Sequence, residues 1–128
     1  MSALENPLLQ LGNKKADGAI AIHRIVKPGS SAGEVAQAAA ATDKLTGVAA
    51  HAAADTEVVR VVKYGRVKLE AGGTIADGDL ITSDADGKAV VAAPAAGVNN
   101  RVIGYADEAA VDGDIFMAIL YPHEIQGA

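Results

Sequence analysis

The sequence contains no cysteine and no tryptophan, and aromatic residues make up only 3 % of its 128 residues. Without cysteine there is no disulfide framework, no thiolate nucleophile and no cysteine-based zinc site. Scarce aromatic side chains argue against a large ligand pocket, whose walls are usually apolar and aromatic. No apolar run approaches the roughly 20 residues of a membrane span, and the start of the chain lacks the basic and apolar regions of a secretory signal. We therefore expect a cytoplasm-made protein with no membrane partner.

Positive charge is also scarce. The net charge is −5 and the pI is near 5.0, which argues against nucleic acid as a partner. Half of the residues are hydrophobic, and most of these are Ala and Val. Burying an Ala methyl contributes about 0.8 kcal/mol, against about 1.5–3 kcal/mol for a Leu, Ile or Phe side chain. Because such a core is thin, we expect subunit contacts to add stability in a homo-oligomer, with a trimer favoured over a dimer.

One stretch of the chain occurs twice. Residues 38–64 return, more loosely, as residues 95–121, at an offset of about 57. Identical positions include Gly47 with Gly104, Ala49 with Ala106, Asp55 with Asp112, and Tyr64 with Tyr121. A self-match at a fixed period predicts a duplicated structural unit. Solvent-facing positions differ, since His51 stands opposite Glu108 and Arg60 opposite Met117.

The remaining pattern predicts a mainly β fold. From Gly18 onward, short β-branched or alternating segments are separated by Gly, Pro and Asp turns, which is typical of a small barrel or sandwich. Asp86-Gly87 predicts a hairpin, and Pro122 predicts the end of the last strand. We expect one β-rich domain over residues 18–128, with about nine strands. The expected strands include 34–38, 44–50, 58–64, 66–70, 80–82, 88–93, 101–106 and 115–121.

The first 17 residues differ from the rest and predict an extended N-terminal arm. Leu4, Leu8, Leu9 and Leu11 crowd around Pro7, which disfavours a continuous helix. The segment is either a frayed terminus or an arm that docks on a neighbouring subunit or partner. Because it lies outside the repeated stretch, we expect the barrel to fold without it.

No catalytic, metal or cofactor site is predicted. The triplets Asp77-Gly78-Asp79 and Asp112-Gly113-Asp114 are interpreted as turns and not as a calcium site, because each precedes an apolar strand. Residues 84–87 resemble a calcium loop only superficially, since Thr82 and Ala93 stand where further acidic ligands belong. There is no Gly-x-Ser-x-Gly motif, so an enzyme is not expected.

Basic residues concentrate within residues 60–68. On an unbroken strand Arg60, Arg66 and Lys68 share one face. They are either a solvated strand face that guards against aggregation or a contact for an acidic partner. Together with Leu4, Pro7, Leu8, Leu9 and Leu11, they are the candidate interface with a partner or a neighbouring subunit.

The order of these elements resembles a known family, the capsid cement (decoration) proteins of tailed bacteriophages, long catalogued as a domain of unknown function. The similarity covers roughly residues 18–121 and the Asn6-Pro7-Leu8-Leu9 opening. Individually weak motifs carry it in combination: Ala21–Lys27, Ala40–Val48, Gly72–Ile75 with Gly78-Asp79, Ala85–Val90, and Arg101–Ala106 with Gly113–Ile115.

This resemblance implies a non-enzymatic protein that binds the outside of an assembled phage head. Its partner would be the shell of major capsid protein, which it stabilises against the pressure of packaged DNA. It would be made in the host bacterial cytoplasm and end on the outer surface of the virion. The alternative is a phage surface β-barrel that recognises a host glycan or another ligand. Such a site needs exposed aromatics, and Phe116 and the tyrosines at 64, 105 and 121 lie mostly in apolar strands, where we expect partial burial.

Overall fold

The computed structural model describes residues 9–128 of the chain. Within these residues there is no helix, and therefore none that could cross a membrane. Nine strands form one hydrogen-bonded sheet, which confirms the predicted mainly β fold. Their bounds are β1 Leu9–Ala16, β2 Ile25–Pro28, β3 Glu34–Gln37, β4 Gly47–Ala49, β5 Val58–Glu70, β6 Leu80–Ser83, β7 Ala89–Val91, β8 Asn99–Ala106 and β9 Ile115–Gln126.

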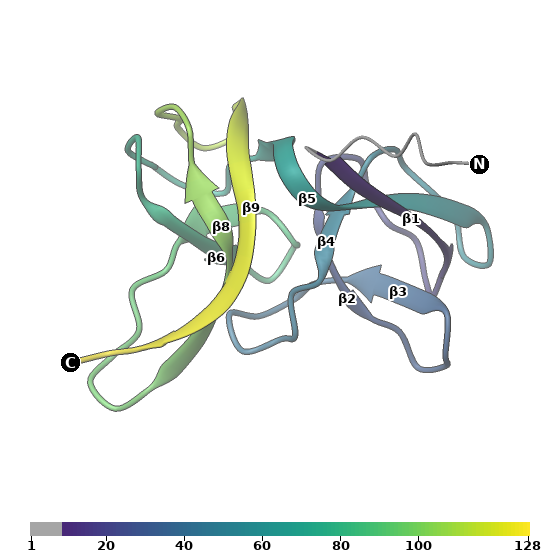
Figure 1. Cartoon of the computed structure of the whole chain (residues 1–128), viewed down its shortest axis with the longest axis horizontal. Helices are drawn as coiled ribbons and strands as arrows, with labels where there is room; N and C mark the ends of the chain where they lie inside the picture. The colour runs from purple at the N-terminus through teal and green to yellow at the C-terminus, as the bar shows by residue number, and fades with distance from the viewer. Residues whose placement is uncertain (1–8) are drawn as a thin grey trace.

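Five strands close into a barrel, as one of the two predicted architectures requires. The order is β1-β3-β2-β4-β5, and β1 then pairs with β5 to close the ring. The β1–β3 pair is parallel and the others are antiparallel. Figure 1 shows this barrel at the right, with β5 leaving it toward the left.

The second half of β5 begins a second unit, which we define as residues 66–126. Its strands follow the order β5-β9-β8-β6-β7, and a parallel bridge between Ala71 and Ala89 joins its two ends. Gly65 lies between the two halves of β5 with a φ of 88°, a value that favours glycine, so the strand bends without ending. Figure 1 shows β6, β8 and β9 at the left, on the far side of β5 from the barrel.

The strand register of the barrel recurs in the second unit. In the barrel Val48 faces Val62 and Ala49 faces Val61. In the second unit, 57 positions further on, Tyr105 faces Ile119 and Ala106 faces Ala118. The duplication itself stays a prediction, while the recurring register makes positions in the two units directly comparable.

Each unit has its own set of small buried side chains. The barrel core is a cluster of eight residues: Ala16, Ile20, Val26, Val35, Ala49, Ala53, Val59 and Val61. The positions that correspond by register all belong to a second cluster: Ala71, Ile75, Ile81, Ala89, Ala106, Ala110, Phe116 and Ala118. That second cluster also contains Ile25, Val48 and Val62 of the barrel, so it extends across the junction between the units.

The extended arm predicted for residues 1–17 is not confirmed. Residues 9–16 form β1, which pairs with β5 on one side and with β3 on the other, and Ala16 is buried in the barrel core. This pairing argues against the expectation that the barrel folds without these residues. The backbone hydrogen bonds of this segment go to β3 and β5, which are distant in the sequence, so its own residues do not predict a strand.

The predicted stop at Pro122 is also wrong, because β9 runs through it to Gln126. Val102 pairs with His123 and Gly104 with Leu120, which leaves Ile103 opposite two residues of β9. Pro122 is one of these two. A β-bulge tolerates a proline because its residues stand outside the regular ladder.

Candidate interaction surfaces

The acidic triplets build turns. The carboxylates of Asp79 and Asp114 accept hydrogen bonds from the backbone N–H groups three residues earlier, at 2.9 and 3.1 Å. Glu57 does the same at 2.7 Å. Gly78 and Gly113 have φ values near +88°, which the turn geometry requires. Across residues 9–128, no three or more His, Asp or Glu side chains gather in a way that could hold a metal.

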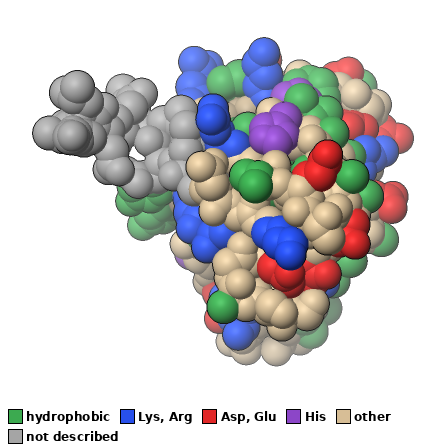
Figure 2. All heavy atoms as spheres, turned by 90° about the vertical axis from the view of Figure 1, so that its right-hand side faces the viewer, with side chains coloured by type: hydrophobic (Ala, Val, Ile, Leu, Met, Phe, Trp, Pro, Cys, Tyr) green, Lys and Arg blue, Asp and Glu red, His purple; other side chains and the backbone are tan. Residues whose placement is uncertain are grey.

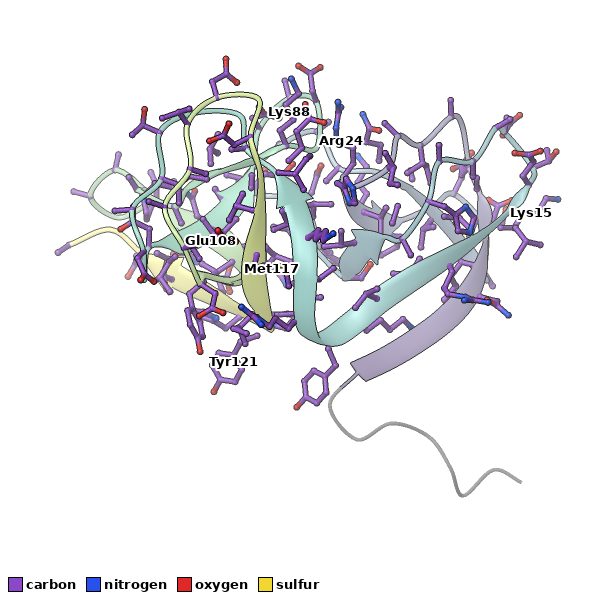
Figure 3. The ribbon with its side chains drawn as sticks, turned by 90° about the horizontal axis from the view of Figure 1, so that it is seen from above. Lys15, Arg24, Lys88, Glu108, Met117 and Tyr121 are labelled. Carbon is purple, nitrogen blue, oxygen red and sulfur yellow. The ribbon has the colours of Figure 1, made fainter. Side chains whose placement is uncertain are left out.

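His51 and Glu108 have the same structural role despite their different chemistry. The Arg60 N–H donates to His51 Nε2 at 3.1 Å, and the Met117 N–H donates to Glu108 Oε2 at 2.9 Å. Figure 3 shows Glu108 beside Met117. The sequence predicts only a solvent-facing difference at this pair, whereas each side chain accepts a hydrogen bond from the backbone at corresponding positions of β5 and β9.

The predicted basic strip is exposed but not uniform. Arg60, Arg66 and Lys68 all lie on β5 with exposed side chains. Val62, between them, is buried, and Gly65 bends the strand, so the strip is not one unbroken face. Arg66 Nε lies 2.9 Å from an Asp107 carboxylate oxygen. Arg66 and Lys68 therefore belong to the second unit, and Arg60 belongs to the barrel.

An apolar row, which the sequence did not reveal, lies beside Arg66. Arg66 faces Ile119 on β9, Ile119 faces Tyr105 on β8, and Tyr105 faces Leu80 on β6. Leu80, Tyr105 and Ile119, which we call the outer row, lie opposite the buried side of the sheet. Tyr105 is 39 % exposed, and the other two are half-buried.

Two more tyrosines continue this face. Gly65 pairs with Leu120, and Tyr64 and Tyr121 flank that pair with exposures of 51 % and 63 %. The rings of Tyr121 and His123 lie 5.5 Å apart. The expected burial of these tyrosines is wrong, because period two along the strands points them away from the core while the bulky Phe116 points in. Tyr and Arg around an apolar centre are typical of binding surfaces.

The corresponding row of the barrel is covered. Ile25 faces Val48 and Val48 faces Val62, and all three are buried at the junction with the second unit. The β6–β7 hairpin lies over this row. The Ile25 N–H donates to the Gly87 carbonyl at 2.9 Å. A Cβ added to Gly87 would come within 2.8 Å of Gln37, so the approach is close.

Charged groups surround the junction. Glu70 lies 3.3 Å from Arg24 and 3.5 Å from Lys88, and Figure 3 shows these two cations side by side between the units. His23 precedes this cluster. Burial lowers the pKa of His23, and the charge of Lys68 lowers it further, while Glu70 acts in the opposite direction. Neutral His23 is therefore favoured in the folded protein.

The open mouth of the barrel forms a hollow of about 200 Å³. It is lined by the β2–β3 hairpin, by Thr46 and by the cations Lys14 and Lys63. The lining residues of the hairpin are Pro28, Ser31, Ala32, Gly33, Glu34 and Val35. In the second unit, the places of Lys63 and Thr46 are taken by buried Leu120 and Ile103. The barrel mouth is thus polar where the mouth of the second unit is apolar.

Of the N-terminal candidate interface residues, some lie in the described part of the chain and some do not. Leu9 and Leu11 belong to β1, where they pair with Gly65 and Val62. Leu4, Pro7 and Leu8 lie outside the described residues.

Comparisons with known proteins give one matching family and one similar solved structure. A model of the family described as phage cement protein matches residues 12–120. A search of curated protein sequences finds no significant match. Among solved structures, the head fiber gp8.5 N base of bacteriophage phi29 is similar, with a TM-score of 0.68 and 23 % identity over 88 % of this chain and 94 % of that chain. Identity at this level shows a shared fold alone.

Proposed function

This chain belongs to the phage cement protein family, and from that premise we propose that it binds the outer surface of an assembled bacteriophage head and stabilises the shell against the pressure of packaged DNA. The observation that carries the proposal is the family match over residues 12–120, nearly the whole described chain. The phi29 head fiber base supports it through a shared fold. The role is structural and not catalytic.

The architecture suits such a role mechanically. All nine strands belong to one sheet, and the two units share β5 without a linker, so load applied to one unit passes to the other through backbone hydrogen bonds. A contact of standard size buries about 1,600 Å² in total. Many copies of a modest contact reinforce a shell without any single contact being tight.

We assign the contacts with the shell to the N-terminal residues and to the basic strip. Leu4, Pro7 and Leu8 precede β1 in the sequence, while Arg60 and Lys68 are exposed cations. The protein is proposed to act as a homo-oligomer, with a trimer favoured over a dimer, because its core of Ala and Val gains stability from subunit contacts.

Co-sedimentation with undecorated phage heads tests the proposal. Wild-type protein should saturate a fixed number of sites per head and raise the temperature at which heads release DNA. A double variant, Arg60→Glu with Lys68→Glu, should bind at least about tenfold more weakly. Lys44→Glu, a charge reversal outside the strip, is the matched control. Wild-type protein that never sediments with heads would contradict the proposal.

One observation favours a second candidate, recognition of a glycan. Tyr64 and Tyr121 are exposed, and sugar sites use exposed aromatic rings. Glycan-array binding that Tyr121→Ala abolishes, without any attachment to heads, would favour this alternative.

A further inference from the structure

Two corresponding rows of side chains differ in whether anything covers them. Ile25, Val48 and Val62 of the barrel are 0 %, 0 % and 6 % exposed, because the second unit lies over them. The register of the strands assigns their places in the second unit to Leu80, Tyr105 and Ile119. In the described residues no third unit follows, and this outer row retains solvent exposure.

The cover over the barrel row shows what kind of surface fits there. It is the hairpin turn at residues 84–88, where Gly87 has a φ of 73° and its carbonyl accepts the Ile25 N–H. The Asp86 carbonyl accepts two further bonds, from Arg24 Nη1 and Gln37 Nε2, each at 2.9 Å. The glycine-containing hairpin of the second unit thus covers the apolar row of the barrel.

The barrel carries the counterpart of that hairpin at residues 29–33. Gly33, two residues before Val35, corresponds to Gly87, two residues before Ala89, and its φ of 80° is similar. A Cβ added at Gly33 would meet nothing within 4 Å, so this hairpin is open. It lines the hollow with Lys14 and Lys63.

The charges of the two units favour attraction between the outer row of the second unit and the hollow of the barrel. Residues 9–65 contain seven Lys and Arg against five Asp and Glu, whereas residues 66–128 contain four against ten. Figure 2 views the outer end of the barrel and shows Lys and Arg side chains gathered on one side of it. Asp79 directly precedes Leu80 of the outer row, whereas Asp107, two residues after Tyr105, is paired with Arg66. Complementary charge of this kind guides association and sets its orientation.

We propose that a second copy of this chain docks on the outer row, with its own barrel hollow seated over Leu80, Tyr105 and Ile119. The contact repeats between copies the arrangement that the two units have within one copy. It is head-to-tail, so each molecule offers one row and one hollow. A head-to-tail contact gives a closed ring, or an open filament where its rotation does not close, and cannot form a two-fold dimer. The inference rests on the proposed homo-oligomer and names its two surfaces.

Two variants that each disable one surface test this arrangement. Tyr105→Glu places a charge in the row, and Lys63→Glu reverses a charge in the hollow. Light scattering of each variant alone should give the 12.9 kDa monomer, while the wild-type chain forms a larger oligomer that salt weakens. An equimolar mixture should give a heterodimer and nothing larger, because one intact row meets one intact hollow. Val111→Glu, at an exposed site outside both surfaces, should oligomerise as wild type.

Circular dichroism and thermal melts verify that each variant is folded, and Tyr105→Ser replaces Tyr105→Glu if the charge prevents folding.

Three results would overturn the inference. Lys63→Glu protein that still self-associates would mean that rows pair with rows. A monomeric wild-type chain would exclude a second copy as the occupant. Tyr105→Glu that loses head attachment with its oligomer unchanged would assign the row to the capsid. In each case, attachment of the wild-type protein to heads is measured separately. Failure of the proposed subunit contact is thereby distinguished from failure of the proposed function.

Discussion

At the scale of single residues, two glycines control how closely strands approach. A Cβ on Gly104 would stand 1.9 Å from the Ile119 carbonyl oxygen, and one on Gly47 would stand 2.6 Å from that of Val62. Because the obstacle is backbone, it cannot move aside as a side chain would. We expect Gly104→Ala to lower the free energy of unfolding by roughly 3 kcal/mol, seen as a large fall in melting temperature. Gly73→Ala, where the nearest atom is 3.9 Å away, should change stability little.

A second residue-scale prediction concerns pH. The folded pKa of His23 lies below its ordinary value of 6.5, with burial as the main cause. The unfolded chain therefore takes up the proton first, and the stability that His23 contributes is lost as pH falls below about 6.5 and through the folded pKa. Replacing it by Asn, which tolerates the positive φ of 64°, should reduce the loss of melting temperature between about pH 8 and about pH 5. An unchanged pH dependence in His23→Asn would contradict this.

At the scale of elements, β1 decides whether the barrel closes. It is the strand that pairs with both β3 and β5, so removing it exposes two unpaired strand edges. We expect a chain that lacks residues 1–16 to lose the cooperative melt and to aggregate. A chain that lacks only residues 1–8 keeps β1 and should melt near the wild-type temperature, while binding phage heads more weakly. A folded protein after removal of residues 1–16 would show that β1 is dispensable.

The strands show how far local sequence determines this fold. Apolar segments between Gly, Pro and Asp turns predicted the positions of β3 to β9, although β5 was expected as two strands, 58–64 and 66–70, and β9 was expected to end at Pro122. β1 was missed because its sequence, with Gly12 and four polar residues, forms a strand only through distant partners. The outer row was missed for a related reason. Leu80, Tyr105 and Ile119 are ordinary apolar strand residues, and only the arrangement of the two units shows that nothing covers them.

At the scale of the whole molecule, attachment to a shell should depend on the oligomer. If each copy makes one modest contact with the head, a ring makes several, and the effective concentration of the later contacts raises the overall affinity by about 10²-fold or more. Tyr105→Glu, as a monomer with its basic strip intact, should therefore leave heads about 10²-fold faster than wild type, with Val111→Glu as the control. Fusing Tyr105→Glu to a three-stranded coiled coil should restore slow release, because the fusion replaces the subunit contact and not the contact with the head. Fast release that the fusion does not correct would mean that Tyr105 touches the capsid directly.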